Sequence, residues 1–208
     1  MAFAVYPAVS PNGSNASITV SSEASDKSGG ARRAAPMQSF NELADVRISL
    51  ARKVRAESVA ALNLILADTM TLRDLYKKHH WQTSGATFYE LHLLFDKHHR
   101  EQERLVDAIA ERIQTLGGIS IAMAADVAET TMLVRPPRDR EEPLLQLVRL
   151  IDAHERVLYG VRMAARRAAA LGDDGTHVLL ASDVIRTNEK QAWLVQEHLQ
   201  RGRLSRGG

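Results

Sequence analysis

Apolar residues recur at helical spacing through most of the chain, and this pattern constrains the fold more than any other feature. From about residue 52 to residue 81 the pattern includes Val54, Ala61, Leu62, Ile65, Leu66, Met70 and Leu75. Steps of three or four positions place such residues on one face of a helix. Similar amphipathic segments run from about 88 to 116, from 141 to 171, and from the acidic turn "DDGT" to about 198. Four such helices are expected to pack around one core.

Glycine-containing turns and one longer connection set the order of these helices. "QTSGAT" separates the first two, Gly117-Gly118 ends the second, and Gly172 ends the third. The connection between the second and third helices includes "SIAMAADVAETT", which predicts a short helix. The sequence therefore predicts an all-α four-helix bundle with a short helix in the middle crossover connection.

The two ends of the chain differ from the bundle in composition. Residues 1–38 are rich in Ala, Ser, Val, Gly and Asn without a lasting period, which predicts a flexible N-terminal tail. "SFNE" at Ser39–Glu42 has the form of a capping box, so we expect a helical pattern to begin there and continue through Leu43 and Leu50. The expected organisation is a tail over 1–38, one domain over 39–199 and a basic C-terminal tail over 200–208.

Cysteine is absent from the chain, which limits the metal chemistry that it can support. Neither a disulfide nor a thiolate metal site is available, so a metal ion must be held by His, Asp and Glu. No stretch approaches ~20 apolar residues, and no basic region followed by an apolar run opens the sequence. We therefore expect a cytoplasmic protein with no membrane partner. A net charge of +2 does not by itself indicate a nucleic-acid-binding protein.

The second helix carries a row of polar residues beside its apolar face. At ~100° per residue, with His92 at zero, the apolar residues Leu91, Phe95, Leu105, Ile109 and Ile113 fall between about −60° and −140°. On the same wheel a second group, His92, Asp96, His99, Glu103, Asp107 and Glu111, falls between about −20° and +100°. The potential metal ligands therefore lie next to the core stripe and outside it.

This position disfavours a di-iron site inside the bundle. Such sites use Glu-x-x-His pairs on core-facing positions, and no Glu in this chain is followed by His three residues later. The row from His92 to Glu111 is ~28 Å long at 1.5 Å per residue, so one ion cannot bind all of it. If two copies of the helix pack antiparallel about a two-fold axis, His92 and Asp96 of one copy lie opposite Asp107 and Glu111 of the other.

His80 completes this hypothesis. It ends the first helix and can fold back across "QTSGAT" to pair with His92, giving a shared cup of two His, two Asp and one Glu. Taken singly, each of these residues is more often an interface or surface hydrogen-bonding residue than a ligand. "ERLVDAIAER" is also compatible with a helix face of ion pairs, in which Arg104 and Arg112 pair with the acids.

The same residues resemble a known family. His80-Trp81, Gly85, Phe88, His92, Asp96, Asp107 and Glu111, followed by "AERIQTLGG", resemble the Dps proteins, which are ferritin-like mini-ferritins that protect DNA in starved cells. The spacing H-x11-H-x3-D-x10-D-x3-E is matched without a departure, and the resemblance extends from about residue 52 to residue 199. A long N-terminal extension is not a uniform feature of that family.

The resemblance implies a function as well as a fold. It implies a homo-dodecameric shell with a ferroxidase site at each two-fold interface, to which one subunit supplies His80, His92 and Asp96 and its neighbour supplies Asp107 and Glu111. Fe(II) would be oxidised there, with hydrogen peroxide as the preferred oxidant over dioxygen, and Fe(III) would mineralise in the cavity. Removing iron and peroxide together would protect DNA from oxidative damage. Zinc is able to occupy the same ligands in place of iron.

Further roles are expected for residues near this site and near the start of the fourth helix. Trp81, next to His80, is a candidate sink for a stray oxidising equivalent, with core packing as the alternative. In a Dps-like shell Asp173, Asp174 and Asp183 would line an iron-entry pore at the three-fold axis, with helix capping as the alternative for the first two.

DNA contact is a separate expectation, because it depends on the tails. Possible contacts, which would be independent of DNA sequence and place the protein on the nucleoid, are Lys27, Arg32, Arg33, Arg201, Arg203 and Arg206. Twelve copies would make these weak cations multivalent, and binding through phosphates depends strongly on salt. The alternative is that both tails are solubilising extensions, or that the N-terminal tail docks on the shell.

One alternative function uses the same bundle without chemistry. A non-catalytic nucleoid-associated or structural shell protein would use the row of acids and histidines only for interface polarity. Outside the row, His79 and His98 are expected to be solvated or interface residues. The same is expected of His99, but His99 and Glu103 share the ligand-row face, where an accessory metal site is the alternative.

Overall fold

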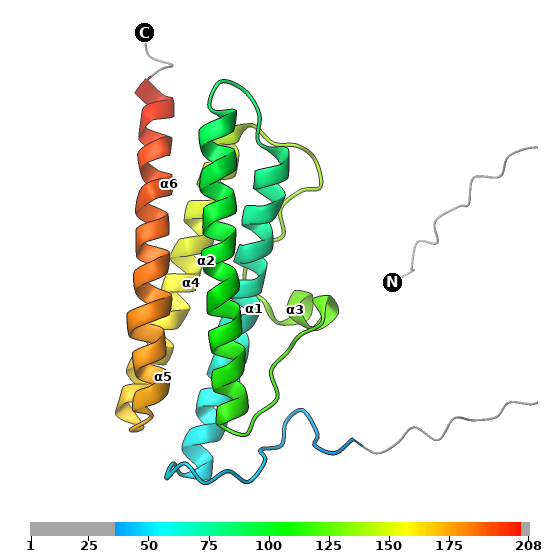
Figure 1. Ribbon diagram of the computed structural model, residues 1–208, viewed down its shortest axis with the longest axis vertical. Helices are drawn as coiled ribbons and strands as arrows, with labels where there is room; N and C mark the ends of the chain where they lie inside the picture. The colour runs from blue at the N-terminus through cyan, green and yellow to red at the C-terminus, as the bar shows by residue number, and fades with distance from the viewer. Residues whose placement is uncertain (1–35, 205–208) are drawn as a thin grey trace, which may run out of the picture. The chain divides into compact units, whose positions relative to one another are not determined.

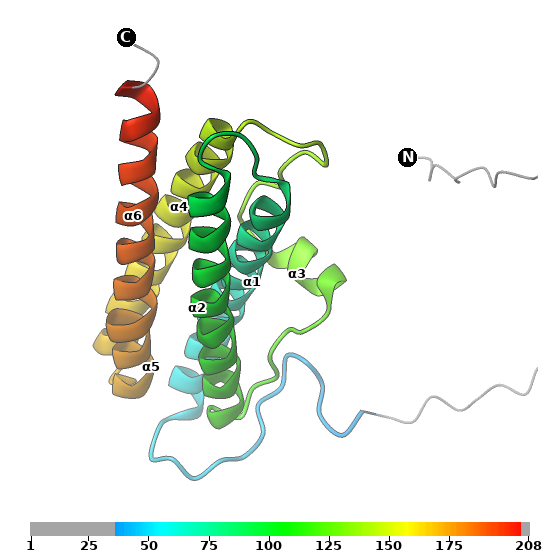
Figure 2. The same ribbon diagram turned by 45° about the horizontal axis from the view of Figure 1, so that its top comes forward.

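The computed structural model describes residues 36–204, with side chains described as far as Gln200. Its helices are α1 (Arg52–Gln82), α2 (Phe88–Thr115), α3 (Ala124–Thr130), α4 (Pro143–Ala170), α5 (Asp174–Val178), the π-helical segment η1 (Leu179–Ile185) and α6 (Arg186–Leu204). Figures 1 and 2 show α1, α2, α4 and the continuous α5–η1–α6 rod side by side, with α3 outside them next to α1. The described residues contain no strand. The predicted all-α bundle with a short crossover helix is confirmed.

Glycine ends α2 and shapes the turn after α1. Gly85 in the α1–α2 turn has a φ of 87°, and Gly117 after α2 has a φ of 82°, a backbone region that residues with a Cβ rarely adopt. The Gly118 N–H bonds to the Ile113 carbonyl at 3.0 Å, which closes the last turn of α2. A Cβ on Gly118 would lie 2.6 Å from a methyl carbon of Val59. Two adjacent glycines are therefore needed, one for its φ and one for close packing on α1.

The core forms where the apolar faces of the long helices meet. All five residues of the predicted α2 stripe are buried: Leu91, Phe95, Leu105, Ile109 and Ile113. They pack with α1 residues such as Leu62 and Leu66, with Leu150 of α4 and with Val195 of α6. No helix within 36–204 is long and apolar enough to cross a membrane.

The helix expected to begin at Ser39 is absent, and this prediction was wrong. Residues 36–51 form turns and extended chain; the Glu42 N–H bonds to the Ser39 carbonyl at 2.9 Å in a single turn. The segment is then held by the end of α2, since the Ala44 N–H bonds to the Gly117 carbonyl at 2.8 Å. Arg55 donates to the carbonyls of both Ala44 and Leu116. Backbone groups that a helix would pair internally are satisfied by this docking instead.

The last helix extends further than the apolar pattern indicated. α6 ends at Leu204, whereas the sequence predicted an end near residue 198 and a tail from residue 200. The helical backbone therefore includes the first residues of the expected C-terminal tail. The predicted N-terminal tail, apart from its last three residues, lies outside the described residues.

Candidate metal centre

His80 and His92 face each other across the α1–α2 turn. Their rings stack with centroids 3.7 Å apart and an interplanar angle of 24°. Nδ1 of His80 lies 2.9 Å from the His92 carbonyl oxygen, and Nδ1 of His92 lies 3.0 Å from the His80 carbonyl oxygen. The turn around Gly85 thus brings the two imidazoles together, as the sequence predicted. Phe88 closes one side, with its ring centroid 5.1 Å from that of His92.

These two hydrogen bonds determine which ring nitrogen is available. A carbonyl oxygen only accepts, so Nδ1 of each imidazole carries the hydrogen and donates it. In a neutral ring Nε2 then keeps its lone pair, which is the group that a metal ion binds. A hydrogen bond from the other ring nitrogen to a carbonyl is also the usual way in which proteins orient metal-binding histidines.

Asp96 lies one helical turn after His92 and is paired with two cations. Lys77 Nζ lies 3.1 Å from Oδ1, and an Arg100 guanidinium nitrogen lies 2.5 Å from Oδ2. The hydrogen bond from Lys77 is the main reason that the pKa of Asp96 is lowered, with the Arg100 charge adding to it. The carboxylate is therefore ionised near neutral pH, and its negative charge is held beside the two histidines.

Asp107 and Glu111 lie on the same helix, far from this group. Both are exposed on α2, one turn apart. From His92 to Asp107 the helix rises by ~22 Å, so one chain cannot bring the two pairs to one ion. Accordingly, no cluster of three metal-ligating side chains occurs within residues 36–200 of a single chain. The structure brings His80 and His92 together, with Asp96 one helical turn further along α2, and leaves Asp107 and Glu111 exposed on the surface.

Trp81 lies on the surface of the single chain, beside His80. Its side chain is 69% exposed, and Lys77 Nζ lies 6.0 Å from the centroid of its ring. Packing in the core of its own subunit, the alternative considered for this residue, is therefore wrong. The role of Trp81 as a radical sink remains a prediction.

His79 and His98 are fully buried, so their expected surface or interface positions were wrong. Burial lowers the pKa of His79 to about 4 and that of His98 to about 3, so both rings are neutral at physiological pH. None of their ring nitrogens has a hydrogen-bond partner among the described residues. His99 is half-buried, and its Nδ1 lies 3.1 Å from the Arg73 carbonyl oxygen, while Glu103 is exposed.

Asp173 caps the helix that begins at α5. It is 1% exposed, and its carboxylate accepts from the Thr176 N–H at 3.1 Å and from Ser58 Oγ at 2.6 Å. Arg112 of α2 completes the group with an ion pair of 2.5 Å. The capping alternative is therefore what the structure shows for Asp173. Asp174 and Asp183 are exposed, so the pore prediction depends on these two residues.

The candidate DNA contacts fall at the edges of the described chain. Lys27, Arg32, Arg33 and Arg206 lie outside the described residues. Arg201 and Arg203 belong to the helical backbone of α6, whose side chains are described only to Gln200. The prediction of DNA contact therefore stays a prediction.

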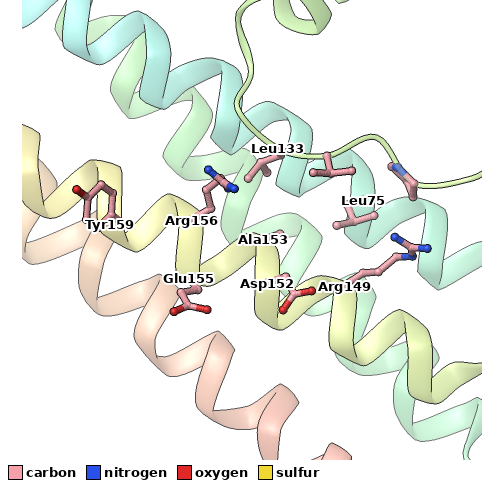
Figure 3. A pocket seen from close by; sticks show the side chains of 10 residues that line it. Leu75, Leu133, Arg149, Asp152, Ala153, Glu155, Arg156 and Tyr159 are labelled. Atoms are coloured by element: carbon pink, nitrogen blue, oxygen red, sulfur yellow. The ribbon is translucent and has the colours of Figure 1, made fainter.

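Two features were not found from the sequence. One is a hollow of about 540 Å³ between α1, α4 and the crossover, lined by Arg149, Asp152, Arg156, Tyr159, Leu75 and Leu133 among others (Figure 3). Its lining has no histidine and so lacks the ligand set of the row on α2. The other is a hydrogen bond inside the core between Tyr76 and His154. Polar residues at core spacing on α6, Asn188 and Gln191 between Val184 and Val195, were a signal that the core contains polar groups.

Comparison with known proteins places this geometry in a family. The family model of the ferritin-like domain matches residues 59–205. The structure of DpsC from Streptomyces coelicolor is 50% identical and superposes with a TM-score of 0.79, covering 79% of this chain and 96% of that one. A DNA protection during starvation protein of Halobacterium salinarum is 33% identical over 70% of this chain and 80% of its own length.

A more distant structure belongs to the same group. The Dps protein of Vibrio cholerae O1, described as a member of a broad superfamily of ferritin-like diiron-carboxylate proteins, is 27% identical with a TM-score of 0.71. It covers 76% of this chain and 99% of that chain. With the four-helix bundle and the pair of histidines at the α1–α2 turn, these matches show that the chain belongs to the Dps family of ferritin-like proteins.

Proposed function

We propose that this protein is a Dps-type ferroxidase and iron-storage protein, whose active site forms only when two subunits meet. Fe(II) is the substrate, hydrogen peroxide or dioxygen is the oxidant, and Fe(III) is stored as mineral inside a shell of twelve subunits. The observation that carries the proposal is the paired imidazoles, each with Nδ1 bonded to the other residue's carbonyl and Nε2 available. This orientation leaves Nε2 of both rings available to a metal ion, which a site that served only interface polarity would not require.

The spacing of residues on α2 supports a two-fold arrangement. An antiparallel pairing that sets His92 opposite Glu111 of a neighbour also sets Asp96 opposite the neighbour's Asp107. The axis then crosses α2 between Glu101 and Gln102. Packed helices lie ~8–10 Å apart, so side chains from both sides reach one ion. Each interface holds two identical sites, because a two-fold contact repeats every pair.

The same register pairs a cation with an anion. It places Arg100 opposite Glu103 of the neighbour, and both side chains are exposed in the single chain. In the single chain Arg100 is bound to Asp96. Pairing with the neighbour's Glu103 would draw Arg100 away from Asp96 and leave Oδ2 of that carboxylate available for iron, while Lys77 stays on Oδ1. Subunit assembly would then prepare the site as well as complete it.

The chemistry follows from the mixed ligands. Three carboxylates and two imidazoles bind Fe(II) with moderate affinity, and the carboxylates favour the ferric product, which is the harder and more charged ion. The ionised state of Asp96 near neutral pH means that no proton has to leave it before Fe(II) binds. Protection of DNA then follows from removing Fe(II) and peroxide together. Direct contact through the basic residues of the tails is an additional proposal.

Rates of Fe(II) oxidation test the enzyme directly. We expect His80→Ala and Asp107→Ala to lose most of the rate with stoichiometric peroxide, although the two residues are far apart in one chain. Glu197→Gln, a change of an exposed carboxylate on α6, is the matched control and is expected to keep the wild-type rate. Equal rates for all four proteins would leave the non-catalytic shell as the better account. Parallel reactions with air in place of peroxide identify the oxidant.

DNA association needs a separate test. A gel-shift series at rising salt, with the full chain and with a variant that lacks residues 1–35, measures the contribution of Lys27, Arg32 and Arg33. A salt-sensitive shift that truncation weakens supports contact through this segment. The absence of any shift at low salt would remove DNA contact from the proposal, while leaving the ferroxidase untouched.

A further inference from the structure

Four buried polar side chains, one from each long helix, form a hydrogen-bonded chain inside the core. Tyr76 of α1, His154 of α4, Asn188 of α6 and Gln102 of α2 are all fully buried. The Tyr76 hydroxyl lies 2.5 Å from His154 Nε2, and His154 Nδ1 lies 3.0 Å from Asn188 Oδ1. Gln102 Nε2 donates to the same Asn188 oxygen at 3.1 Å. None of these four side chains takes part in the proposed iron ligation.

The direction of each hydrogen bond can be worked out from Asn188. Its Nδ2 donates to the Val184 carbonyl at 2.8 Å, so its Oδ1 is the acceptor for both of its other partners. His154 therefore carries its hydrogen on Nδ1, and Nε2 holds the lone pair. It follows that the Tyr76 O–H donates to His154 Nε2. A phenol bonded to a neutral imidazole base is the result.

The surroundings keep both groups neutral. Burial lowers the pKa of His154 to about 4, and burial, with the charge of Glu101 adding to it, raises the pKa of Tyr76 well above its usual value. Removing an electron from a buried phenol would leave an unsolvated cation, which is costly unless the proton leaves at the same time. The lone pair on His154 is placed to take that proton.

The pair also lies close to the proposed iron site. Tyr76 precedes His80 by one helical turn, an axial rise of ~6 Å. Its ring centroid is 6.1 Å from that of Phe95, the residue before Asp96, and it meets His98 edge-to-face at 5.1 Å. The phenol is therefore packed against two α2 residues that lie close to the proposed ligand Asp96 in the sequence.

We propose that Tyr76 and His154 form a buried redox pair that supplies one electron when peroxide is consumed at the interface site, an inference that rests on the proposed ferroxidase function. Fe(II) gives one electron to hydrogen peroxide, which yields Fe(III), hydroxide and a hydroxyl radical. Tyr76 gives the second electron, which reduces the radical to hydroxide, and passes its phenolic proton to His154 Nε2. A tyrosyl radical and an imidazolium remain. A second Fe(II) returns the electron, the proton goes back to the phenolate oxygen, and Fe(III) forms.

The sum of these steps is the oxidation of two Fe(II) by one peroxide with no radical left over. The pair lets one iron ion start the reaction before the second has arrived. Trp81 differs from it, because the indole is exposed in the single chain and no imidazole among residues 36–200 is hydrogen-bonded to it. Tyr76 is therefore a residue that acts on the oxidant through electron transfer and does not itself bind iron.

Freeze-quench electron paramagnetic resonance tests the pair in the assembled full-length protein, with one Fe(II) per site and excess peroxide. Wild type is expected to show a tyrosyl signal that decays when a second Fe(II) is added. Tyr76→Phe is expected to lose that signal, and His154→Gln, which removes the imidazole base and keeps Tyr76, is expected to reduce it severalfold. Tyr89→Phe is the matched control, because it changes an exposed tyrosine near His92 and is expected to keep the signal.

The outcomes separate this inference from the function on which it rests. Fe(II) loss is followed optically in the same samples. If wild type oxidises Fe(II) but shows no tyrosyl signal, the redox pair is refuted and the ferroxidase stands. The same holds if Tyr76→Phe still shows the tyrosyl signal.

If no iron is oxidised, the pair is tested without iron by a flash-generated ruthenium(III) oxidant in a variant that keeps Tyr76 as its single tyrosine. A tyrosyl signal in that variant, weakened by His154→Gln, supports the pair. The absence of the tyrosyl signal refutes the pair.

Discussion

The Asp173 group offers a sharp test of how the fourth helix is fixed to the bundle. Its carboxylate bonds to Thr176 in its own helix, to Ser58 of α1 and to Arg112 of α2, so one buried side chain ties three elements together. Asp173→Asn keeps a side-chain oxygen for the cap and removes the charge that Arg112 faces. Asp173→Ala removes both the cap and the charge.

The expected loss can be estimated from the burial of each partner. Breaking a buried ion pair by removing one partner costs roughly 3–5 kcal/mol, and we lower this to roughly 2–3 kcal/mol because water reaches the Arg112 side chain. For a domain of this size roughly 2–4 °C in Tm corresponds to 1 kcal/mol, so Asp173→Asn should lower Tm by roughly 4–12 °C. Loss of the cap in Asp173→Ala should add about 1 kcal/mol.

Thermal unfolding at fixed protein concentration measures this effect. Asp174→Asn is the matched control, because the next residue is an exposed aspartate and is expected to change Tm little. The reasoning would be refuted if Asp173→Asn and Asp174→Asn unfolded at the same temperature. If Asp173→Asn kept its Tm and instead slowed iron uptake, the carboxylate would belong to an entry pore.

The stability that the Asp173–Arg112 pair contributes should also depend on pH. Burial alone would raise the pKa of Asp173, but hydrogen bonds from Ser58 and Thr176 and the charge of Arg112 outweigh burial and lower it. A carboxyl with a lowered folded-state pKa stabilises the fold above its unfolded pKa of about 3.9 and loses that contribution as pH falls through the folded value. The difference in Tm between wild type and Asp173→Asn should be full at neutral pH and shrink in acid. A difference that did not change with pH would contradict the charge-based explanation.

Two other changes test the subunit contact and the end of α2. Arg100→Glu and Glu103→Arg should each weaken the two-fold dimer, because each creates two like-charge pairs per interface. The double variant should restore the dimer. Native mass spectrometry measures the dissociation, and a double variant as dissociated as the single ones would contradict the register. Gly118→Ala should lower Tm by several degrees in thermal unfolding, because the new Cβ would lie 2.6 Å from Val59, and an unchanged Tm would show that α1 moves freely at this point.

Helical periodicity was sufficient to predict the bundle, because burial of one apolar face determines where each long helix forms. It failed at Ser39, where "SFNE" has the local chemistry of a helix start but the backbone docks on the Gly117 carbonyl. That contact joins residues far apart in the sequence, so no local pattern reports it. Periodicity also missed the end of α6, where the helix continues beyond the last core residues.

The two buried histidines show a different kind of error. On the wheel of α2, His98 falls near −120°, inside the angular range of the core stripe. On α1, His79 follows Leu72, Leu75 and Tyr76 at helical spacing, which is also a core position. Their polarity was given more weight than their position, and position was correct. The bond between Tyr76 and His154 joins residues far apart in the sequence, so no local pattern reports it.

Of the candidate site, the pairing of His80 with His92 could be predicted from the sequence. The turn around Gly85 brings His80 and His92 together, because the two residues flank a short connection between antiparallel helices. Asp107 and Glu111 cannot be joined to them within one chain, since the distance along α2 is too great. The rest of the proposed site depends on contact between subunits, so its test needs more than one subunit.

Mixed assemblies of two inactive variants test most directly whether the site is shared between subunits. His80→Ala and Asp107→Ala subunits, assembled in equal amounts, pair as unlike subunits at about half of the two-fold interfaces. Each unlike pair contains one site with both wild-type residues, so about a quarter of all sites should be intact. The account predicts that mixing restores about a quarter of the wild-type rate of Fe(II) oxidation. A mixture no more active than either variant alone would contradict a site shared between subunits.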